Sequence, residues 1–112
     1  MQTTTIIAPQ VSQAVGTSAT AIGGYSPPAS SGAIVSSIIL ANITGSTITA
    51  TVDLYNGSVA TRLVVNAPIA ANDCLVLGGS TVKILLVTGW SIRVTSNTAS
   101  SIDASMSVTQ FT

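Results

Sequence analysis

Hydrophobic and polar residues alternate along the middle of the chain with the period of a β-strand. From residue 47 to residue 55 every second position is apolar, and the positions between carry Thr, Asp or Tyr. Successive side chains of a strand point to opposite faces, so this segment predicts a strand with one buried face. Asn56-Gly57 follows, and residues 59–65 form a second β-branched segment. We expect a hairpin closed by a type I′ turn at Asn56-Gly57, because both residues tolerate a positive φ.

The remaining strand candidates fill most of the chain. Residues 33–43 are apolar at positions of both parities, which predicts a central strand covered on both faces. Residues 66–68, with Pro68, are expected to interrupt the sheet. Further short strands, separated by Gly, Asn and Asp turn signals, are expected at residues 74–77, 81–87, 90–96 and 102–111. Their inward residues include Trp90, Ile92, Val94, Ile102, Ala104, Met106 and Val108.

These segments predict an all-β fold. About eight short, mostly antiparallel strands, with turns roughly every ten residues, are typical of a single β-sandwich or jelly-roll-like domain. The first 24 residues are less regular, and their apolar positions are compatible with one short edge strand at residues 6–15. A loop follows at Tyr25-Ser26-Pro27-Pro28. We therefore divide the chain into an N-terminal arm or edge segment, residues 1–24, and a β-sandwich domain, residues 25–112.

Composition supports this fold and adds an unusual feature. Ile, Val and Thr together account for 40 of the 112 residues, which favours pleated sheet over helix. The charged residues are three basic and three acidic ones, or 5% of the chain, whereas an ordinary soluble domain has ~25%. A net charge of zero does not keep copies of a protein apart. Either Ser and Thr alone solvate a monomer, or much of the surface is covered by further copies or a larger assembly. We favour the second.

Several classes of partner are not expected. Arg62, Lys83 and Arg93 are too few to neutralise the phosphates of a nucleic acid. The chain contains no uninterrupted apolar run of the length that crosses a membrane. Its first residues lack the basic and apolar regions of a signal peptide, so synthesis in a cytoplasm is expected.

The sequence offers little chemistry. It has no His and no Glu, and nothing in the pattern places Asp53, Asp73 or Asp103 beside one another. We therefore expect no enzyme, no catalytic residue and no cofactor. One Cys without His excludes a structural zinc site. Cys74, beside Leu75, is expected to be a small core residue.

The pair Asn72 and Asp73 and the aromatic residues Trp90 and Tyr55 are the remaining candidates for binding sites. Asn72 and Asp73, with backbone carbonyls, are the residues of a conceivable calcium site, but a capped turn is the favoured interpretation. Trp90 alternates in phase with the inward residues, which favours core packing over a sugar-binding platform. Tyr55 lies on the Thr-rich face of its strand and is the best candidate for an exposed contact residue.

A set of segments occurs in a recognisable order: Tyr25-Ser26-Pro27-Pro28, residues 34–44 ending in Asn42-Ile43-Thr44, residues 47–65, Pro68-Ile69-Ala70-Ala71-Asn72-Asp73-Cys74-Leu75, residues 89–95 and residues 105–111. The chain resembles small β-sandwich structural proteins of tailed bacteriophage particles in these segments, which cover about three-quarters of its length. One position departs from the family pattern, which favours Asp where this chain has Trp90.

The resemblance implies a structural virion protein, made in the host cytoplasm. Such a protein is a decoration or cement subunit that binds and stabilises a capsid, or a neck or tail accessory subunit. The implied partners are the major capsid or tail proteins of the same particle and further copies of the chain, with a trimer as the expected oligomer. The alternative is a glycan-binding adhesion module of a tail or fibre. A pilus or surface-layer subunit is a further rival, and it would require export.

Overall fold

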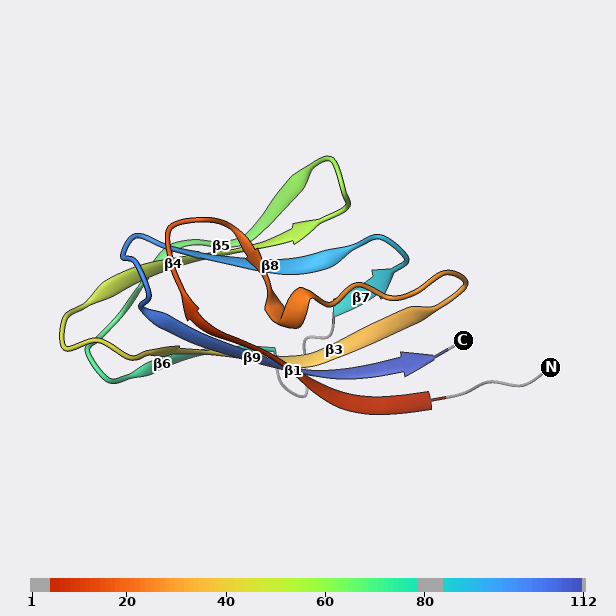
Figure 1. The fold of residues 1–112 in the computed structure, drawn as a ribbon, viewed down its shortest axis with the longest axis horizontal. Coiled ribbons are helices and arrows are strands. Elements are labelled where there is room, and N and C mark those ends of the chain that lie inside the picture. Colours follow the sequence, from red (N-terminus) through yellow and green to blue (C-terminus); the bar gives the residue numbers. More distant parts are fainter. Residues whose placement is uncertain (1–4, 79–83, 112) are drawn as a thin grey trace.

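The computed structural model describes residues 5–78 and 84–111 and shows two antiparallel β-sheets packed face to face (Figure 1). Sheet A has five strands in the order β1-β9-β3-β6, with β7 also pairing with β3, and sheet B has the order β2-β8-β4-β5. The elements are β1 (Thr5–Val15), β2 (Thr20–Ala21), the 3₁₀ turn η1 (Ile22–Gly24), β3 (Gly32–Asn42), β4 (Ile48–Tyr55), β5 (Ala60–Ile69), β6 (Cys74–Gly78), β7 (Ile84–Val87), β8 (Ser91–Ser96) and β9 (Ile102–Phe111). The predicted all-β sandwich is confirmed.

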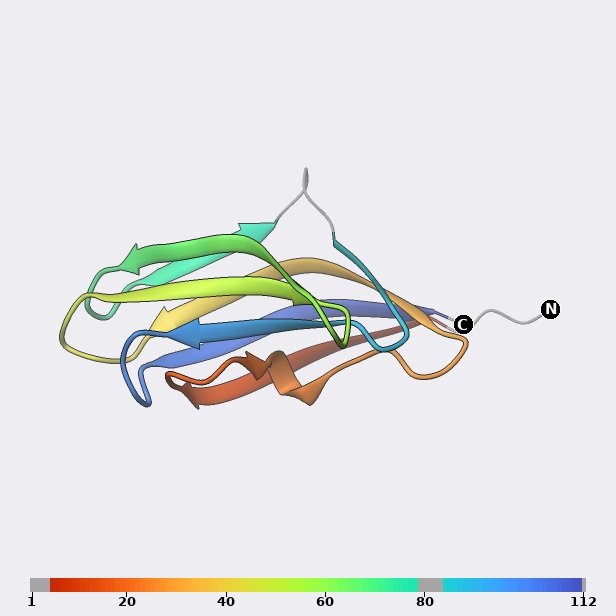
Figure 2. The ribbon, with the colours of Figure 1, turned by 90° about the horizontal axis from the view of Figure 1, so that it is seen from above.

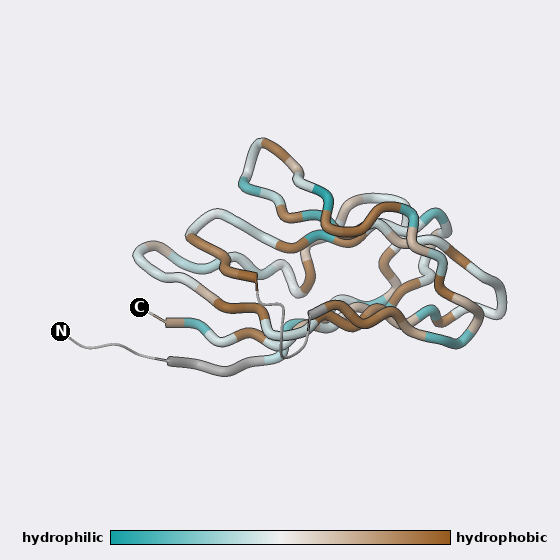
Figure 3. The backbone as a smooth tube through the Cα atoms, turned by 180° about the vertical axis from the view of Figure 1, so that it is seen from behind, coloured by the Kyte–Doolittle hydropathy of each residue, from teal (hydrophilic) through white to brown (hydrophobic). Residues whose placement is uncertain are grey.

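The core lies between the two sheets and is built from alternate residues of their strands. Figure 3 shows hydrophobic segments along the strands of both layers. The inward residues predicted for β8 and β9 are confirmed, because Ile92, Val94, Ile102, Ala104, Met106 and Val108 are at most 2% exposed. On β4 the alternation places Ile48, Ala50 and Val52 in the core, each at most 1% exposed. Trp90 is partly buried and packs against this core, as predicted.

β3 is the central strand of sheet A, as predicted, but its outward face is not covered within one chain. Val35 lies opposite Val108 of β9, and Ser37 lies opposite the next residue of β9, Ser107. Ser36 is therefore an extra residue in β3 and forms a β-bulge. The bulge shifts the alternation, and inward residues fall at both odd and even positions. This shift explains part of the mixed pattern that suggested double coverage. That prediction is wrong for the single chain, since Ile39 on the outward face is 41% exposed.

The predicted hairpin is confirmed, with a different turn. The last cross-strand pair is Tyr55 with Ala60, which leaves a four-residue loop between β4 and β5. The Asn56 side-chain oxygen accepts hydrogen bonds from the amides of Ser58 (2.9 Å) and Val59 (2.7 Å). Asn56 does not have the positive φ that a type I′ turn requires. The Asn side chain closes this loop instead, as in an Asx-turn.

The predicted interruption at residues 66–68 is also wrong. β5 continues through this segment, with Ala67 opposite Ala50 and Pro68 opposite Thr49. β5 is an edge strand, where the missing N–H of a proline is tolerated. Asn66 takes a positive φ of 48° at a register shift, and its N–H donates to Thr51 Oγ1 at 3.1 Å. This contact holds the bulged strand on the sheet.

The first 24 residues contribute to both the sheet and the core. β1 pairs along its length with β9, and η1 packs against the side of β1 that faces sheet B, where Figure 2 draws it over the strand. Val15 and Ile22 are 3% and 0% exposed. The division into an arm of residues 1–24 and a domain of residues 25–112 stays a prediction. The buried side chains of Val15 and Ile22 provide a way to test it. Residues 81–83, the first part of the strand predicted at residues 81–87, lie outside the described residues.

The described residues include no helix long and apolar enough to cross a membrane.

Replacing Ile22 by Ala tests whether η1 belongs to the cooperative core. We expect the free energy of unfolding to fall by about 2–5 kcal/mol, because a fully buried side chain leaves a cavity. Chemical denaturation measures the change, and Ile43→Ala is the control at a position 48% exposed. Equal stability of the two variants would show that residues 25–112 form the domain without η1.

Candidate assembly surface

The outward side of sheet A carries a row of aligned residues across four strands. The register places Val76 of β6 beside Ile39 of β3, Ile39 beside Ser105 of β9, and Ser105 beside Val11 of β1. Paired residues of neighbouring strands point to the same side of a sheet, so these four side chains form one row facing away from the core. Three of the four, Val11, Ile39 and Val76, are aliphatic and exposed to solvent.

We call this surface the apolar face and define it by Val11, Ile39, Val76, Leu85 and Val87. Their exposed fractions run from 41% for Ile39 to 59% for Val11. Among the described strand residues that point outward from sheet A, Asp103 is the one charged side chain. Contiguous exposed apolar residues of this kind mark interaction sites more often than free surface.

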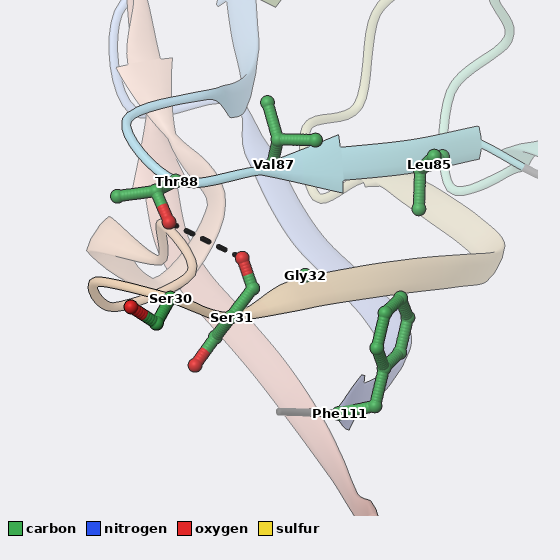
Figure 4. Close-up of a pocket in the computed structure, with 7 residues that line it drawn as sticks. All are labelled: Ser30, Ser31, Gly32, Leu85, Val87, Thr88 and Phe111. Carbon is green, nitrogen blue, oxygen red and sulfur yellow. Dashed lines mark hydrogen bonds between the residues drawn. The ribbon is translucent and has the colours of Figure 1, made fainter.

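A hollow of about 430 Å³ lies at the end of the apolar face, between β3, β7 and the last residues of β9 (Figure 4). Leu85 and Val87 line it on one side and Phe111 on the other. The Phe111 ring lies across Gly32, where an added Cβ would be 2.9 Å from the ring carbon Cζ. Gly32 therefore provides the space that the ring occupies. The nearby loop is held by Thr88 Oγ1, which donates to the Ser31 carbonyl at 3.2 Å.

A second hollow, of about 280 Å³, lies around Val11 and Ile39 and reaches Asp103. The Asp103 carboxylate accepts a hydrogen bond from the Ala14 amide at 2.9 Å, where β1 bulges with a φ of 53° at Ala14. Asp103 is thus engaged in holding the end of β1. Both hollows are concave, mainly apolar parts of one surface.

The outward side of sheet B carries a row of charged residues beside the exposed Val65. A row across its four strands contains Ala21, Arg93, Asp53 and Arg62. Arg93 Nε lies 2.9 Å from Asp53 Oδ1, and the Arg93 guanidinium carbon lies 3.8 Å from the centre of the Tyr55 ring. The Asp53 side chain is only 7% exposed, so this ion pair is largely shielded from water. Half of the six charged residues of the chain belong to this row or its ion pair.

Replacing Arg93 by Met tests the contribution of this pair. We expect the free energy of unfolding to fall by about 1–3 kcal/mol, because the shielded Asp53 carboxylate loses its partner. The control is Arg62→Met, since Arg62 is exposed and makes no ion pair with any described residue. Urea unfolding of both variants, and of Arg93→Met combined with Asp53→Asn, measures the coupling between the two side chains. Equal losses in the two arginine variants would contradict this role.

The other residues singled out by the sequence are scattered. Tyr55 is only partly exposed, and one face of its ring is occupied by Arg93. Cys74 is exposed, so the prediction of a core cysteine is wrong. The alternation in β6 turns Leu75 and Leu77 toward the core and leaves Cys74 outside.

The three carboxylates are not brought together. Asp53 pairs with Arg93, Asp103 binds the Ala14 amide, and the Asp73 carboxylate accepts from the Cys74 amide at 2.8 Å. Asn72 has a positive φ of 59° in the predicted turn, which is confirmed. Within residues 5–78 and 84–111 no group of three metal-ligating side chains occurs.

Tyr25 lies in the predicted loop and joins it to β9. Its hydroxyl donates to Gln110 Oε1 at 2.7 Å. Burial raises the pKa of the Tyr25 hydroxyl above its ordinary value of 10.0, because desolvation disfavours the phenolate. The folded chain therefore keeps this proton at a pH where the unfolded chain loses it. The resulting stability is fully present below the unfolded pKa and is lost as the pH rises through the folded pKa.

Tyr25→Phe should therefore reduce the alkaline loss of stability. We expect the drop in denaturation midpoint between about pH 8 and about pH 11 to be smaller in Tyr25→Phe than in the wild type. Tyr55→Phe is the control for a general effect of removing a phenol. An identical drop in the wild type and in Tyr25→Phe would show that Tyr25 does not titrate with folding.

No protein-family model matches the chain, and no curated protein sequence matches it. Among solved structures, it is similar to a protein in the cryo-EM structure of the virus-like particle of extra small virus, from the giant freshwater prawn Macrobrachium rosenbergii. The TM-score is 0.55 at 11% identity, over 99% of this chain and 80% of the other. It is also similar to a protein of the disulfide-linked pili that form Bacillus endospore appendages. There the TM-score is 0.51 at 16% identity, over 99% of this chain and 89% of the other.

At these identities the two likenesses establish a shared fold. Both neighbours come from repetitive protein assemblies, so the fold is one that occurs in structural subunits. Neither is a tailed-phage protein by its description, and the resemblance to tailed-phage subunits stays a prediction. The sequence did contain a signal for the apolar face, namely the apolar residues of both parities in residues 33–43. This pattern predicts a strand covered on both faces, and within one chain only the inner face is covered.

Proposed function

We propose that the chain is a structural subunit that attaches to a larger protein particle through the apolar face. The observation that carries this proposal is the aligned row of Val76, Ile39 and Val11 on the uncovered side of a five-stranded sheet. Burial of such residues gains roughly 25 cal/mol per Å² of apolar surface. With Asp103 as the one outward charge on the described strands of sheet A, few charged groups lose their water on contact.

The finer form of the proposal is a decoration or cement subunit of a tailed-phage capsid, or a neck or tail accessory subunit. Its support is the sequence resemblance together with a fold that also occurs in a virus-like particle. The partners would be the major capsid or tail proteins, with further copies of the chain. Its location would be the virion, and its role would be adhesive rather than enzymatic.

The two rivals have less support. A glycan-binding module would present an open aromatic surface, and Arg93 already occupies one face of the Tyr55 ring. A pilus subunit shares the coarse role of a structural subunit, and its support is the likeness to the Bacillus protein. The two proposals differ in the particle that contains the chain, which is a virion in one and a pilus in the other.

Sedimentation of the native source lysate in a density gradient tests the general proposal. We expect the chain, detected by mass spectrometry, to travel with large particles in fixed stoichiometry. The copy number then separates a capsid-wide subunit from a ring at the neck or tail. A chain that stays at the top of the gradient as a small species would overturn the proposal.

Val76→Lys tests the surface itself. Val76 is 57% exposed, so the substitution should leave the fold intact, while a lysine buried against a particle costs its hydration. We expect particle binding to weaken by about tenfold or more. Val65→Lys on the outward side of sheet B, also 57% exposed, is the matched control. Unchanged binding of the Val76 variant would exclude the apolar face as the contact.

A further inference from the structure

A β-sandwich exposes unpaired backbone N–H and C=O groups along the edges of its sheets. Natural proteins protect such edges with short strands, charged side chains, prolines or bulges, because a bare edge pairs with other chains. Here the edge strands are β1, β6 and β7 in sheet A, and β2 and β5 in sheet B. The protection of each one can be compared directly.

Four of these five edges are protected. β2 has two residues, β7 has four and β6 has five, which leaves little backbone to pair. β5 is longer, with ten residues, but it carries the exposed charge of Arg62, Pro68 and two register shifts. Each of these features opposes the addition of another strand.

β1 lacks most of this protection. It has eleven residues and pairs with β9 without a register shift from Thr5 to Ser12. The first 52 residues of the chain contain no charged side chain at all. Pro9 removes one donor, and the bulge at Ala14 affects only the end of the strand. No described strand pairs with the other side of β1.

The inner and outer faces of β1 differ in what they contact. On the inner face, Ser12 Oγ donates to the Ala21 carbonyl and accepts from the Gly23 amide at 2.8 Å, so η1 packs there. On the outer face, Val11 is 59% exposed. η1 thus holds β1 from its inner side, where a Cβ added at Gly23 would lie 3.2 Å from the Val11 backbone nitrogen.

We propose that the free edge of β1 pairs with β1 of a second copy of this chain, antiparallel and about a twofold axis. The pairing would join two five-stranded sheets into one continuous sheet. In such a contact residue i of one copy lies opposite residue j of the other, and β1 brings no charged side chain to any of these positions. This inference rests on the proposed function, because it identifies one contact of the same structural subunit. The twofold contact predicts a dimer, whereas the resemblance implies a trimer.

Three exposed valines provide matched tests of this contact: Val11 at 59%, Val76 at 57% and Val65 at 57% exposure. Each is replaced by Lys in the full-length protein, and sedimentation equilibrium measures self-association. Wild type should form dimers, and Val11→Lys should raise the dissociation constant roughly tenfold, since a charged side chain on an edge strand opposes the addition of another strand. Val65→Lys and Val76→Lys should remain dimeric.

The results distinguish this inference from the proposed function. Val76→Lys should lose particle binding and remain a dimer, because the particle contact of the apolar face and the β1 contact between copies use different residues. Association lost in Val76→Lys but kept in Val11→Lys would overturn the edge contact. A wild type that stays monomeric at roughly 100 µM, or that forms a trimer, would also overturn it.

Hydrogen exchange gives a readout that does not depend on a substitution. The amides of β1 should exchange more slowly at a protein concentration that favours the dimer than at a dilute one, while those of β5 should not change. Equal exchange of β1 at both concentrations, in a protein shown to associate, would overturn the proposal.

Discussion

The bulge at Ser36 is the constraint on which sheet A depends. It reverses the alternation in the middle of β3, so that Val35 before it and Ile38 and Leu40 after it all point into the core, each at most 1% exposed. Without the extra residue, one half of the strand would turn its buried side chains to solvent. Because β3 pairs with β9, β6 and β7, the same shift sets the direction of the side chains on all of them.

This arrangement separates the two outer surfaces of the sandwich by chemistry. The outward side chains of sheet A are mostly aliphatic or carry hydroxyl groups, with Asp103 as the one charge on its described strands, whereas the outward row of sheet B holds Asp53 between two arginines.

Much of the fold could be predicted because its signals are local. The alternation in β4, β8 and β9 correctly predicted the inward residues, because a strict period of two assigns every second side chain to the buried face of a strand. The errors arose where the partner strand decides the outcome. The Asn56 side chain closed a longer loop than the dipeptide suggested, Pro68 was tolerated because β5 is an edge, and Cys74 fell outside because Leu75 and Leu77 took the core side of β6.

By itself, the sequence determined that this protein is an all-β domain with very few charges. These properties follow from side-chain types and short-range periodicity. Only the tertiary structure decided which aliphatic residues remain outside, because Ile39 and Leu40 differ only in the side of the sheet to which the bulge assigns them. It also brought Arg93 to Asp53, 40 residues away along the chain, because cross-strand register joins residues that no local pattern connects.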